Sequence, residues 1–303
     1  MRFRADISNT SQFTRLITSL TPLGKTATLK LKADTVHLIC TGDGARGGVQ
    51  VWSQIAVASI FNLTNFRLES NNHNEIYLEV ATDSLARALK SAAGATVATI
   101  KLAKKGGAGP GGTGKGAYPV LSLSIESSSR LGKRLEITQD VAVKVKKAAE
   151  IEQLKEPLCP QPDVIILLPP LSILRTVAER LKTVSPYITL SANNAGEFRM
   201  RAEADEAKVE TEWRGLKRPN TGDDDMAAAP PADPAHFFRV TLDAKNLLKF
   251  LASYAIAATT IMCLCPGHCA IFYVYVGDSK DRVEGGVLTY FIPARTAGED
   301  EDD

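Results

Sequence analysis

The sequence lacks a long apolar run and an apolar leader. Residues 250–276 carry no formal charge, but Pro266-Gly267-His268 interrupts them, and the run after that turn is only eight residues long. A membrane-spanning helix needs about 20 apolar residues without such a break. The charged start, MRFRADISNT, has no apolar stretch behind it, as a secretory signal would require. We expect no signal peptide, no membrane span, and a helix end followed by two buried strands at 250–276.

Cysteine is scarce and irregularly spaced, with five residues in a chain of 303. An odd number at irregular spacing does not suggest a disulfide framework, so we expect a reducing compartment. Four soft side chains do fall within the segment CLCPGHC, namely Cys263, Cys265, His268 and Cys269. Structural zinc usually takes two ligand pairs far apart in sequence, and we find no second pair. We therefore predict cysteines that pack in strands as small hydrophobes, with no metal site and no cofactor.

Catalytic signatures are missing as well. The segment Gly109–Lys115 fits the first seven positions of a phosphate-binding loop, but the eighth position, which needs a hydroxyl to hold Mg²⁺, is Gly116. A strand-like run follows where a helix is required. None of the four histidines has an evident Ser, Cys or acid partner. We predict a protein that is not an enzyme and has no catalytic residues; a nucleotide hydrolase built on Lys115 is the alternative from another class.

The formal charge of +2 hides an uneven distribution. Five acids end the chain at 299–303, and three more stand at 223–225. Without these eight acids, 36 basic residues face 26 acidic ones, which is a charge of about +10. Terminal and loop acid runs are usually solvated. The remaining body is moderately basic, which permits a polyanion partner without demanding one.

Hydrophobic periodicity predicts two helices in each half of the chain, among many short strands. Apolar residues recur at helical spacing in SQFTRLITSL and DSLARALKSA of the first half, and in LSILRTVAERLKTV and DAKNLLKFLASY of the second. We expect Ser8 or Asn9 to cap the first helix and Asp83 to cap the second. Alternating runs such as TATLKLK, VHLIC and AIFYVYV predict strands. The absence of strict β-α-β alternation argues against a doubly wound nucleotide fold.

The two halves repeat one plan. Asp83 and Asp243 lead matching helical segments 160 residues apart, and the segments around Phe13 and Leu171 show about the same offset. This register predicts a tandem duplication of one β-rich domain with two helices. Residues 141–163 join the halves, and their three prolines disfavour regular structure.

The polar faces of the four predicted helices are basic, whereas a solvent-facing surface normally mixes both signs. Glu179 is the single acid within these faces. An ordinary solvated surface is one explanation, and presentation of cations to a phosphate backbone is the other. Aromatic residues, 6% of the chain, seldom interleave with these cations, which argues against stacking on single-stranded bases. The cations are Arg15, Arg87, Lys90, Arg175, Arg180, Lys182, Lys245 and Lys249.

Several segments are similar to those of a known family. NEIYLEVATDSLARALK and EPLCPQPDV are specific, and MRFRA, FTRLITSL, GGVQVW and YFIPA support them; together they run from Met1 to Ala294. In these segments the chain resembles the Hus-type subunits of the checkpoint (nine-one-one) DNA sliding clamp, which are related to proliferating-cell nuclear antigen. The glycine-rich stretch, the TGDDDMAAAPPADPA stretch and the acidic tail depart from the family pattern.

The resemblance implies an α+β fold of two tandem sliding-clamp (DNA clamp) domains. Each domain would pack two helices on a curved antiparallel sheet, and the two together would form one third of a ring. The domains would span 1–140 and 164–295, with an interdomain connector at 141–163 and an acidic tail at 296–303. The helices would line the central hole, so that the eight cations face double-stranded DNA.

The resemblance also implies surfaces for other proteins. Edge strands at 118–125 and 207–213 would join neighbouring subunits. The implied interface positions are Tyr118, Val120, Ser122, Lys208, Glu210 and Glu212. The connector would border a groove for docking partners, to which Val145, Phe291 and Pro293 contribute.

The implied function is that of a non-catalytic subunit of a heterotrimeric clamp. Two paralogous clamp subunits would complete the ring, which encircles duplex DNA at damage or stalled forks in the nucleus. Further implied partners are an ATP-driven clamp loader, a checkpoint kinase activator and DNA repair enzymes, with no membrane. A homotrimeric replication processivity clamp is the alternative within the same fold.

Overall fold

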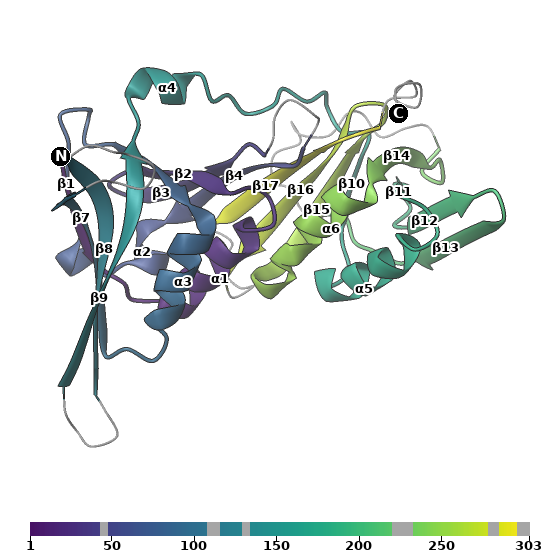
Figure 1. Cartoon of the computed structure of the whole chain (residues 1–303). Coiled ribbons are helices and arrows are strands. Elements are labelled where there is room, and N and C mark those ends of the chain that lie inside the picture. The colour runs from purple at the N-terminus through teal and green to yellow at the C-terminus, as the bar shows by residue number, and fades with distance from the viewer. Residues whose placement is uncertain (43–47, 108–115, 129–133, 220–232, 278–284, 296–303) are drawn as a thin grey trace. The chain divides into compact units, whose positions relative to one another are not determined.

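The computed structural model describes residues 1–42, 48–107, 116–128, 134–219, 233–277 and 285–295. The chain divides into two compact units (Figure 1). Unit 1 comprises 1–40, 52–155 and 281–286, and unit 2 comprises 41–51, 156–280 and 287–303. The stretch Gly109–Lys115, which matches part of a phosphate-binding loop, lies outside the described residues. The acidic runs at 223–225 and 299–303 lie outside them too.

Unit 1 is a sheet with helices packed on it. Its strand order is β4-β3-β2-β6-β9-β8-β7-β1-β5, and the pairs with assigned registers are antiparallel. The elements are β1 (Arg2–Asp6), α1 (Thr10–Leu20), β2 (Thr26–Leu31), β3 (Thr35–Cys40), β4 (Gln50–Ala56, in this unit from Trp52), α2 (Val57–Ile60), the 3₁₀ helix η2 (Leu63–Asn65), β5 (Arg67–Glu69), β6 (Ile76–Ala81), α3 (Thr82–Ser91), β7 (Val97–Gly106), β8 (Ala117–Ser128), β9 (Arg134–Val145) and α4 (Ala148–Glu152).

The two long helices of unit 1 form where an apolar stripe can be buried. The predicted stripes of α1 and α3 are confirmed, and the two helices contact each other. The Asn9 side chain caps α1 by accepting a hydrogen bond from the Gln12 N–H at 3.0 Å, as expected. The expected cap by Asp83 is wrong. Because α3 already begins at Thr82, its N-cap is Ala81, which has no side-chain acceptor, and Asp83 lies in the first turn.

Unit 2 contains two antiparallel sheets, ordered β10-β15-β16-β17 and β13-β12-β11-β14. The helices α5 and α6 contact each other, and each buries one apolar stripe. The elements are β10 (Val164–Leu167), α5 (Leu171–Leu181), β11 (Tyr187–Ala192), β12 (Phe198–Ala204), β13 (Ala207–Trp213), β14 (Phe238–Asp243), α6 (Ala244–Leu251), the 3₁₀ helix η4 (Ala252–Ala255), β15 (Ala257–Cys265), β16 (Cys269–Val276) and β17 (Val287–Pro293).

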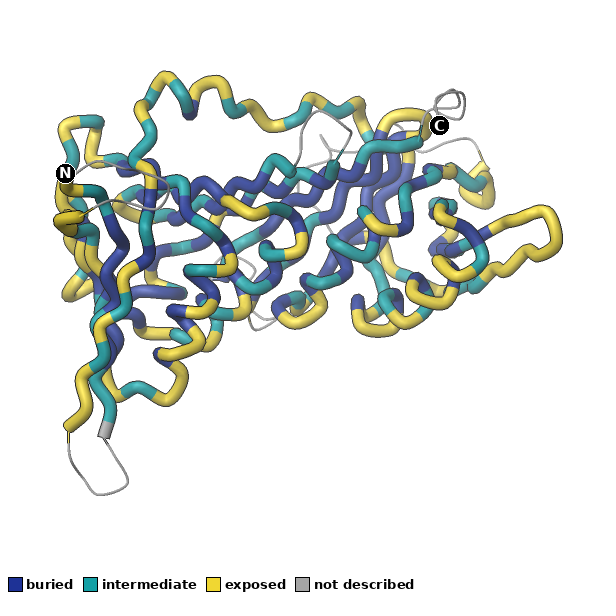
Figure 2. The backbone as a smooth tube through the Cα atoms, in the orientation of Figure 1, coloured by how far each residue is buried: buried dark blue, intermediate teal, exposed yellow. Residues whose placement is uncertain are grey.

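The uncharged segment 250–276 is confirmed as a helix end followed by two strands. After α6 and η4 the chain forms the hairpin of β15 and β16, in which Cys265 pairs with Cys269. The strand residues of this hairpin are mostly buried, as Figure 2 shows by the dark blue of the tube. Among the described residues, no helix is long and apolar enough to cross a membrane.

The order of elements recurs in the two units. Unit 1 runs β1-α1-β2-β3-β4, then β6-α3-β7-β8-β9, and unit 2 runs β10-α5-β11-β12-β13, then β14-α6-β15-β16-β17. Unit 1 additionally has α2, η2 and β5 between the two parts. The helix starts at Thr10 and Leu171 keep the offset of roughly 160 residues that a tandem duplication would produce.

The connector is shorter than expected. Residues 141–145 belong to β9, and α4 follows at Ala148–Glu152. The segment without helix or strand is therefore 153–163, which contains the three prolines.

The two repeated helix starts differ in capping, which gives a matched test. Asp243 accepts hydrogen bonds from the N–H groups of Lys245 at 2.6 Å and Asn246 at 3.0 Å, whereas Asp83 caps nothing. We predict that Asp243→Ala lowers the free energy of unfolding by about 1 kcal/mol. The corresponding Asp83→Ala should cost less than about 0.5 kcal/mol, as expected for a surface substitution. Denaturant unfolding of both variants checks this, and equal losses would contradict it.

His37 on β3 should make stability depend on pH. It is half-buried and pairs with Lys30 of β2; burial lowers its pKa, and the charges of Lys32 and Lys30 lower it further. Since the folded-state pKa is below the unfolded value of about 6.5, the unfolded chain binds the proton first as pH falls. The contribution of neutral His37 to the free energy of unfolding is thus fully present above about pH 6.5, and it is lost as the pH falls through the folded-state pKa.

We predict that melting temperature falls less between about pH 7.5 and 5.5 in His37→Gln than in the native chain. The control is His73→Asn, because His73 is exposed and has a left-handed φ of 47°, which Asn tolerates. This control should keep the native pH dependence. An unchanged profile for His37→Gln would refute the assignment.

Candidate nucleic-acid interface and subunit edges

Three of the predicted cations project from the helices of unit 1. Burial of Phe13, Leu16 and their neighbours fixes the orientation of α1, so that Arg15 is exposed. Its guanidinium donates to the Ser11 carbonyl at 3.4 Å and to the Ser11 hydroxyl at 3.2 Å, both within the same helix. On α3, Arg87 and Lys90 are exposed, opposite the buried stripe. Lys90 lies in the last turn, where a cation complements the helix dipole.

Five predicted cations lie on or beside the helices of unit 2. Arg180, Lys182 and Lys245 are exposed, whereas Arg175 and Lys249 are partly buried. Arg175 is the least available of the eight cations for binding a phosphate, because its guanidinium already has partners within the chain. Its Nε lies 2.9 Å from a Glu179 carboxylate oxygen, and its guanidinium carbon lies 5.2 Å from the centre of the Tyr254 ring.

The exposed helix faces carry more basic than acidic side chains. Within the described part of the chain, Arg175 is the one member of the eight that forms an ion pair. The other seven leave their charge available to solvent or to an anion. Such side chains can neutralise phosphates without reading a sequence.

Strand β13 is an edge, as expected for 207–213. It is the end strand of its sheet and, among the described residues, pairs with β12 alone. Lys208 and Glu210 are exposed, and Val209 between them is an exposed large apolar residue. An edge strand of this kind offers unpaired backbone groups to another strand.

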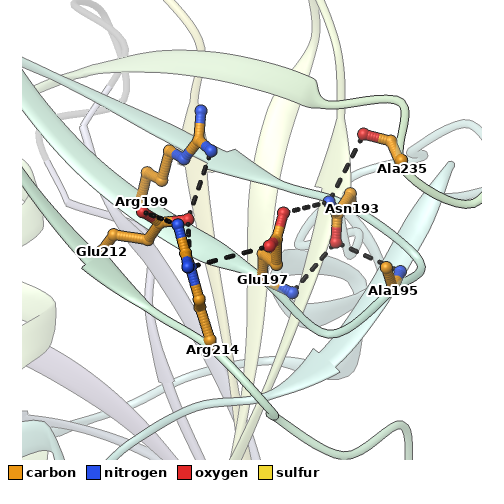
Figure 3. A network of polar contacts seen from close by, with 7 residues as sticks. All are labelled: Asn193, Ala195, Glu197, Arg199, Glu212, Arg214 and Ala235. Atoms are coloured by element: carbon orange, nitrogen blue, oxygen red, sulfur yellow. Dashed lines mark hydrogen bonds and ion pairs between the residues drawn. The ribbon is translucent and has the colours of Figure 1, made fainter.

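A polar network holds the end of β13 against β12 and the following turn (Figure 3). Glu212 receives hydrogen bonds from Arg199 at 3.2 Å and from Arg214 at 3.1 Å. The hydrogen bonds from Arg214, with those from Arg199, hold the pKa of Glu212 below its usual value. Buried Asn193 accepts from the N–H groups of Ala195 and Glu197, which closes the turn between β11 and β12. Glu212 is thus already engaged within the subunit.

The prediction that residues 118–125 form an edge strand is wrong. These residues belong to β8, which pairs with β7 on one side and with β9 on the other. From Val120 to residue 125 both sides of the strand are consequently paired, and Val120 and Ser122 are buried. Tyr118 pairs with Lys105 of β7 and, among the described residues, has no assigned partner in β9. The alternating sequence predicts a strand here but carries no signal for which strands flank it.

The available edge of this part of unit 1 is the first part of β9. Among the described residues, 134–142 pair with β8 alone, and 143–145 pair with β6. Leu135 is 49% exposed there, as Val209 on β13 is 41% exposed. Each unit therefore has an edge strand with an exposed apolar side chain.

A small groove in unit 2 includes two of the three predicted groove residues. Phe291 and Pro293 of β17 line a cavity of about 160 Å³. Val145 is not among its lining residues and lies at the end of β9 in unit 1, opposite Leu78. The groove also includes Pro157 and Cys159 from the 153–163 segment, and the neighbouring Leu158 is 96% exposed. The remaining lining residues are Gly48, Gln50, His268 and Cys269.

Two solved structures have the same architecture. The proliferating cell nuclear antigen from Thermococcus kodakaraensis matches with a TM-score of 0.68 at 15% identity, covering 97% of this chain and 100% of that chain. The corresponding protein from Entamoeba histolytica matches with a TM-score of 0.65 at 12% identity, covering 97% and 99%. The fold is that of a DNA sliding clamp, of the α+β class.

The chain belongs to the Hus1-like protein family, whose model matches residues 1–296. It is 35% identical over 297 residues to the "Checkpoint protein hus1" of Schizosaccharomyces pombe, covering 96% of this chain and 98% of that protein. It is 30% identical to the "Checkpoint protein HUS1" of Homo sapiens, covering 97% and 99%. The resemblance found in the sequence, and the fold it implies, are confirmed.

Proposed function

We propose that this chain is a non-catalytic subunit of a heterotrimeric sliding clamp that encircles duplex DNA at damage or stalled forks. Membership of the Hus1-like family and the clamp fold support a checkpoint clamp subunit over the homotrimeric alternative. The observation that carries the DNA-binding part is the set of basic side chains on the exposed faces of α1, α3, α5 and α6.

The mechanism follows from topology and charge. A closed ring around a double strand cannot dissociate without opening, so its retention needs only weak contacts that slide along the phosphates. Exposed arginines and lysines on helices supply such contacts, because counterion release favours them regardless of base sequence. Loading would then require an ATP-driven machine that opens the ring. A checkpoint kinase activator and DNA repair enzymes would be recruited afterwards, in the nucleus.

Ring closure is proposed to use the two edges, one for each paralogous subunit. The free part of β9 would pair with one neighbour, and β13 would pair with the other, because each offers unpaired backbone groups. Leu135 and Val209 add apolar area at these edges. This assignment keeps Lys208 and Glu210 at an interface and replaces the β8 positions with residues 134–142.

The groove of unit 2 is proposed as a docking site for an apolar segment of a partner protein. Phe291, Pro293 and Pro157 give it an apolar lining, and Leu158 adds an exposed apolar side chain beside it. Burial of such side chains against a partner would remove apolar area from water.

Removal of helix cations should weaken DNA binding in a salt-dependent way. For the ring assembled with its two paralogues, we predict that combined Ala replacement of Arg87, Lys90 and Lys245 lowers the slope of log affinity against log salt. The magnitude of this slope should decrease by about 0.9 for each phosphate contact that is removed. Binding to a short duplex across a series of salt concentrations measures it.

A strand cation provides the control for this experiment. Lys104 is exposed on β7, so Lys104→Ala removes a positive charge without touching a helix face. The proposal requires its slope to match that of the native ring. If the slope decreased as much for each charge removed in Lys104→Ala as in the combined helix variant, the effect would be one of general charge, and the helix faces would drop out of the proposal.

Charge placed on either edge should release one neighbour. We predict that Leu135→Arg and Val209→Arg each weaken association with a different paralogue at least tenfold, because a charge without a partner would be buried in the interface. Leu63→Arg is the matched control, since Leu63 is 60% exposed and lies on η2. Pairwise binding of purified subunits gives the answer, and an effect of both edge variants on the same paralogue would overturn the assignment.

A further inference from the structure

The tertiary structure brings a cysteine that is distant in sequence next to the CLCPGHC segment. Cys159 of the 153–163 segment lies beside the turn between β15 and β16, and its Sγ is 3.3 Å from the Sγ of Cys269. The ligand atoms of Cys159, His268 and Cys269 all lie within 4.8 Å of one another. Because Cys159 is 110 residues from Cys269, its participation leaves no trace in the spacing of CLCPGHC.

Hydrogen bonds to backbone carbonyls hold both segments that contribute these side chains. The turn is closed by the His268 N–H, which donates to the Cys265 carbonyl at 3.0 Å, and Gly267 has a left-handed φ of 71°. The Cys265 thiol donates to the Pro160 carbonyl at 3.5 Å, directly after Cys159. Asp163 donates its N–H to the Leu264 carbonyl at 3.0 Å. The Cys159 region is therefore tied to the end of β15 through two contacts.

The three side chains match the requirements of a borderline-soft cation. Two thiolates and one imidazole suit Zn²⁺, which takes sulfur ligands at about 2.3 Å and nitrogen ligands at about 2.0–2.1 Å. A tetrahedral ion with these bonds would separate its two sulfur ligands by about 3.8 Å, and each sulfur from the nitrogen by about 3.5 Å. The observed Sγ–Sγ distance of 3.3 Å is shorter than this by about 0.5 Å, so the two thiols would move apart by that amount when the ion binds.

The surroundings leave room for a fourth ligand. Cys159, His268 and Cys269 all line the cavity of about 160 Å³ in unit 2. Cys269 is buried, Cys159 is partly buried and His268 is exposed, so one side of the cluster faces water. This is the arrangement of three protein ligands with one open position.

We propose that Cys159, His268 and Cys269 bind a zinc-like divalent cation, with the fourth position open to water or to a group from a docked protein. The bound ion would join the 153–163 segment to the β15–β16 turn. It would thereby fix Pro157 and Leu158 at the groove that Phe291 and Pro293 line. The site does not depend on the proposed clamp function.

The test uses the full chain, reduced with a phosphine and freed of metal. Titration with Co²⁺ should give thiolate-to-cobalt charge-transfer bands and the visible bands of a tetrahedral site at one equivalent. Zn²⁺ should displace the cobalt at one equivalent and raise the melting temperature. Hydrogen exchange in residues 153–163 should slow when Zn²⁺ is bound.

Variants separate the cluster from other cysteines. Cys159→Ser and His268→Ala should each weaken Co²⁺ binding at least tenfold, while Cys40→Ala in unit 1 should bind as the native chain does. His268 is exposed, so its replacement keeps the fold and tests the site even if a cysteine variant does not fold. The proposal fails if the reduced native chain gives no tetrahedral cobalt spectrum, or if His268→Ala binds with native affinity. It also fails if the isolated chain carries a Cys159–Cys269 disulfide in place of metal.

Discussion

The structure depends on the burial of one apolar stripe from each long helix. On α1 that stripe includes Phe13, Leu16 and Leu20, all almost completely buried. A helix repeats every 3.6 residues, so fixing this face also fixes the opposite one. Arg15 is exposed for that reason, and Arg87 and Lys90 on α3 follow the same rule. The basic surface is therefore a geometric consequence of the hydrophobic core, and any loss of core packing would also disperse the charges.

Strand pairing imposes a second constraint, which concerns assembly. A strand that is hydrogen-bonded on both sides has no backbone groups left for a neighbour, and β8 is in this position. The first part of β9 and strand β13 each have one free side in the described chain. The position of a strand within its sheet, more than its composition, decides whether it can join another subunit.

The segment between the units has a structural role of its own. Its prolines prevent helix or strand formation at 153–163, and hydrogen bonds at Pro160 and Asp163 hold it against the end of β15. That placement brings Cys159 and Pro157 to the groove next to β17. A cation bound there would hold this segment in place beside the groove.

The sequence by itself determined the four long helices, most strands, the duplicated plan and the family, because hydrophobic periodicity and specific segments such as EPLCPQPDV are local. It also identified the basic helix positions, since their spacing from the apolar stripe is fixed within one helix. The tertiary structure alone decided that β8 is internal, that α3 begins before Asp83 can cap it, and that Cys159 meets Cys269. These outcomes depend on pairing order and on contacts between residues as far as 110 positions apart, to which local patterns carry no signal.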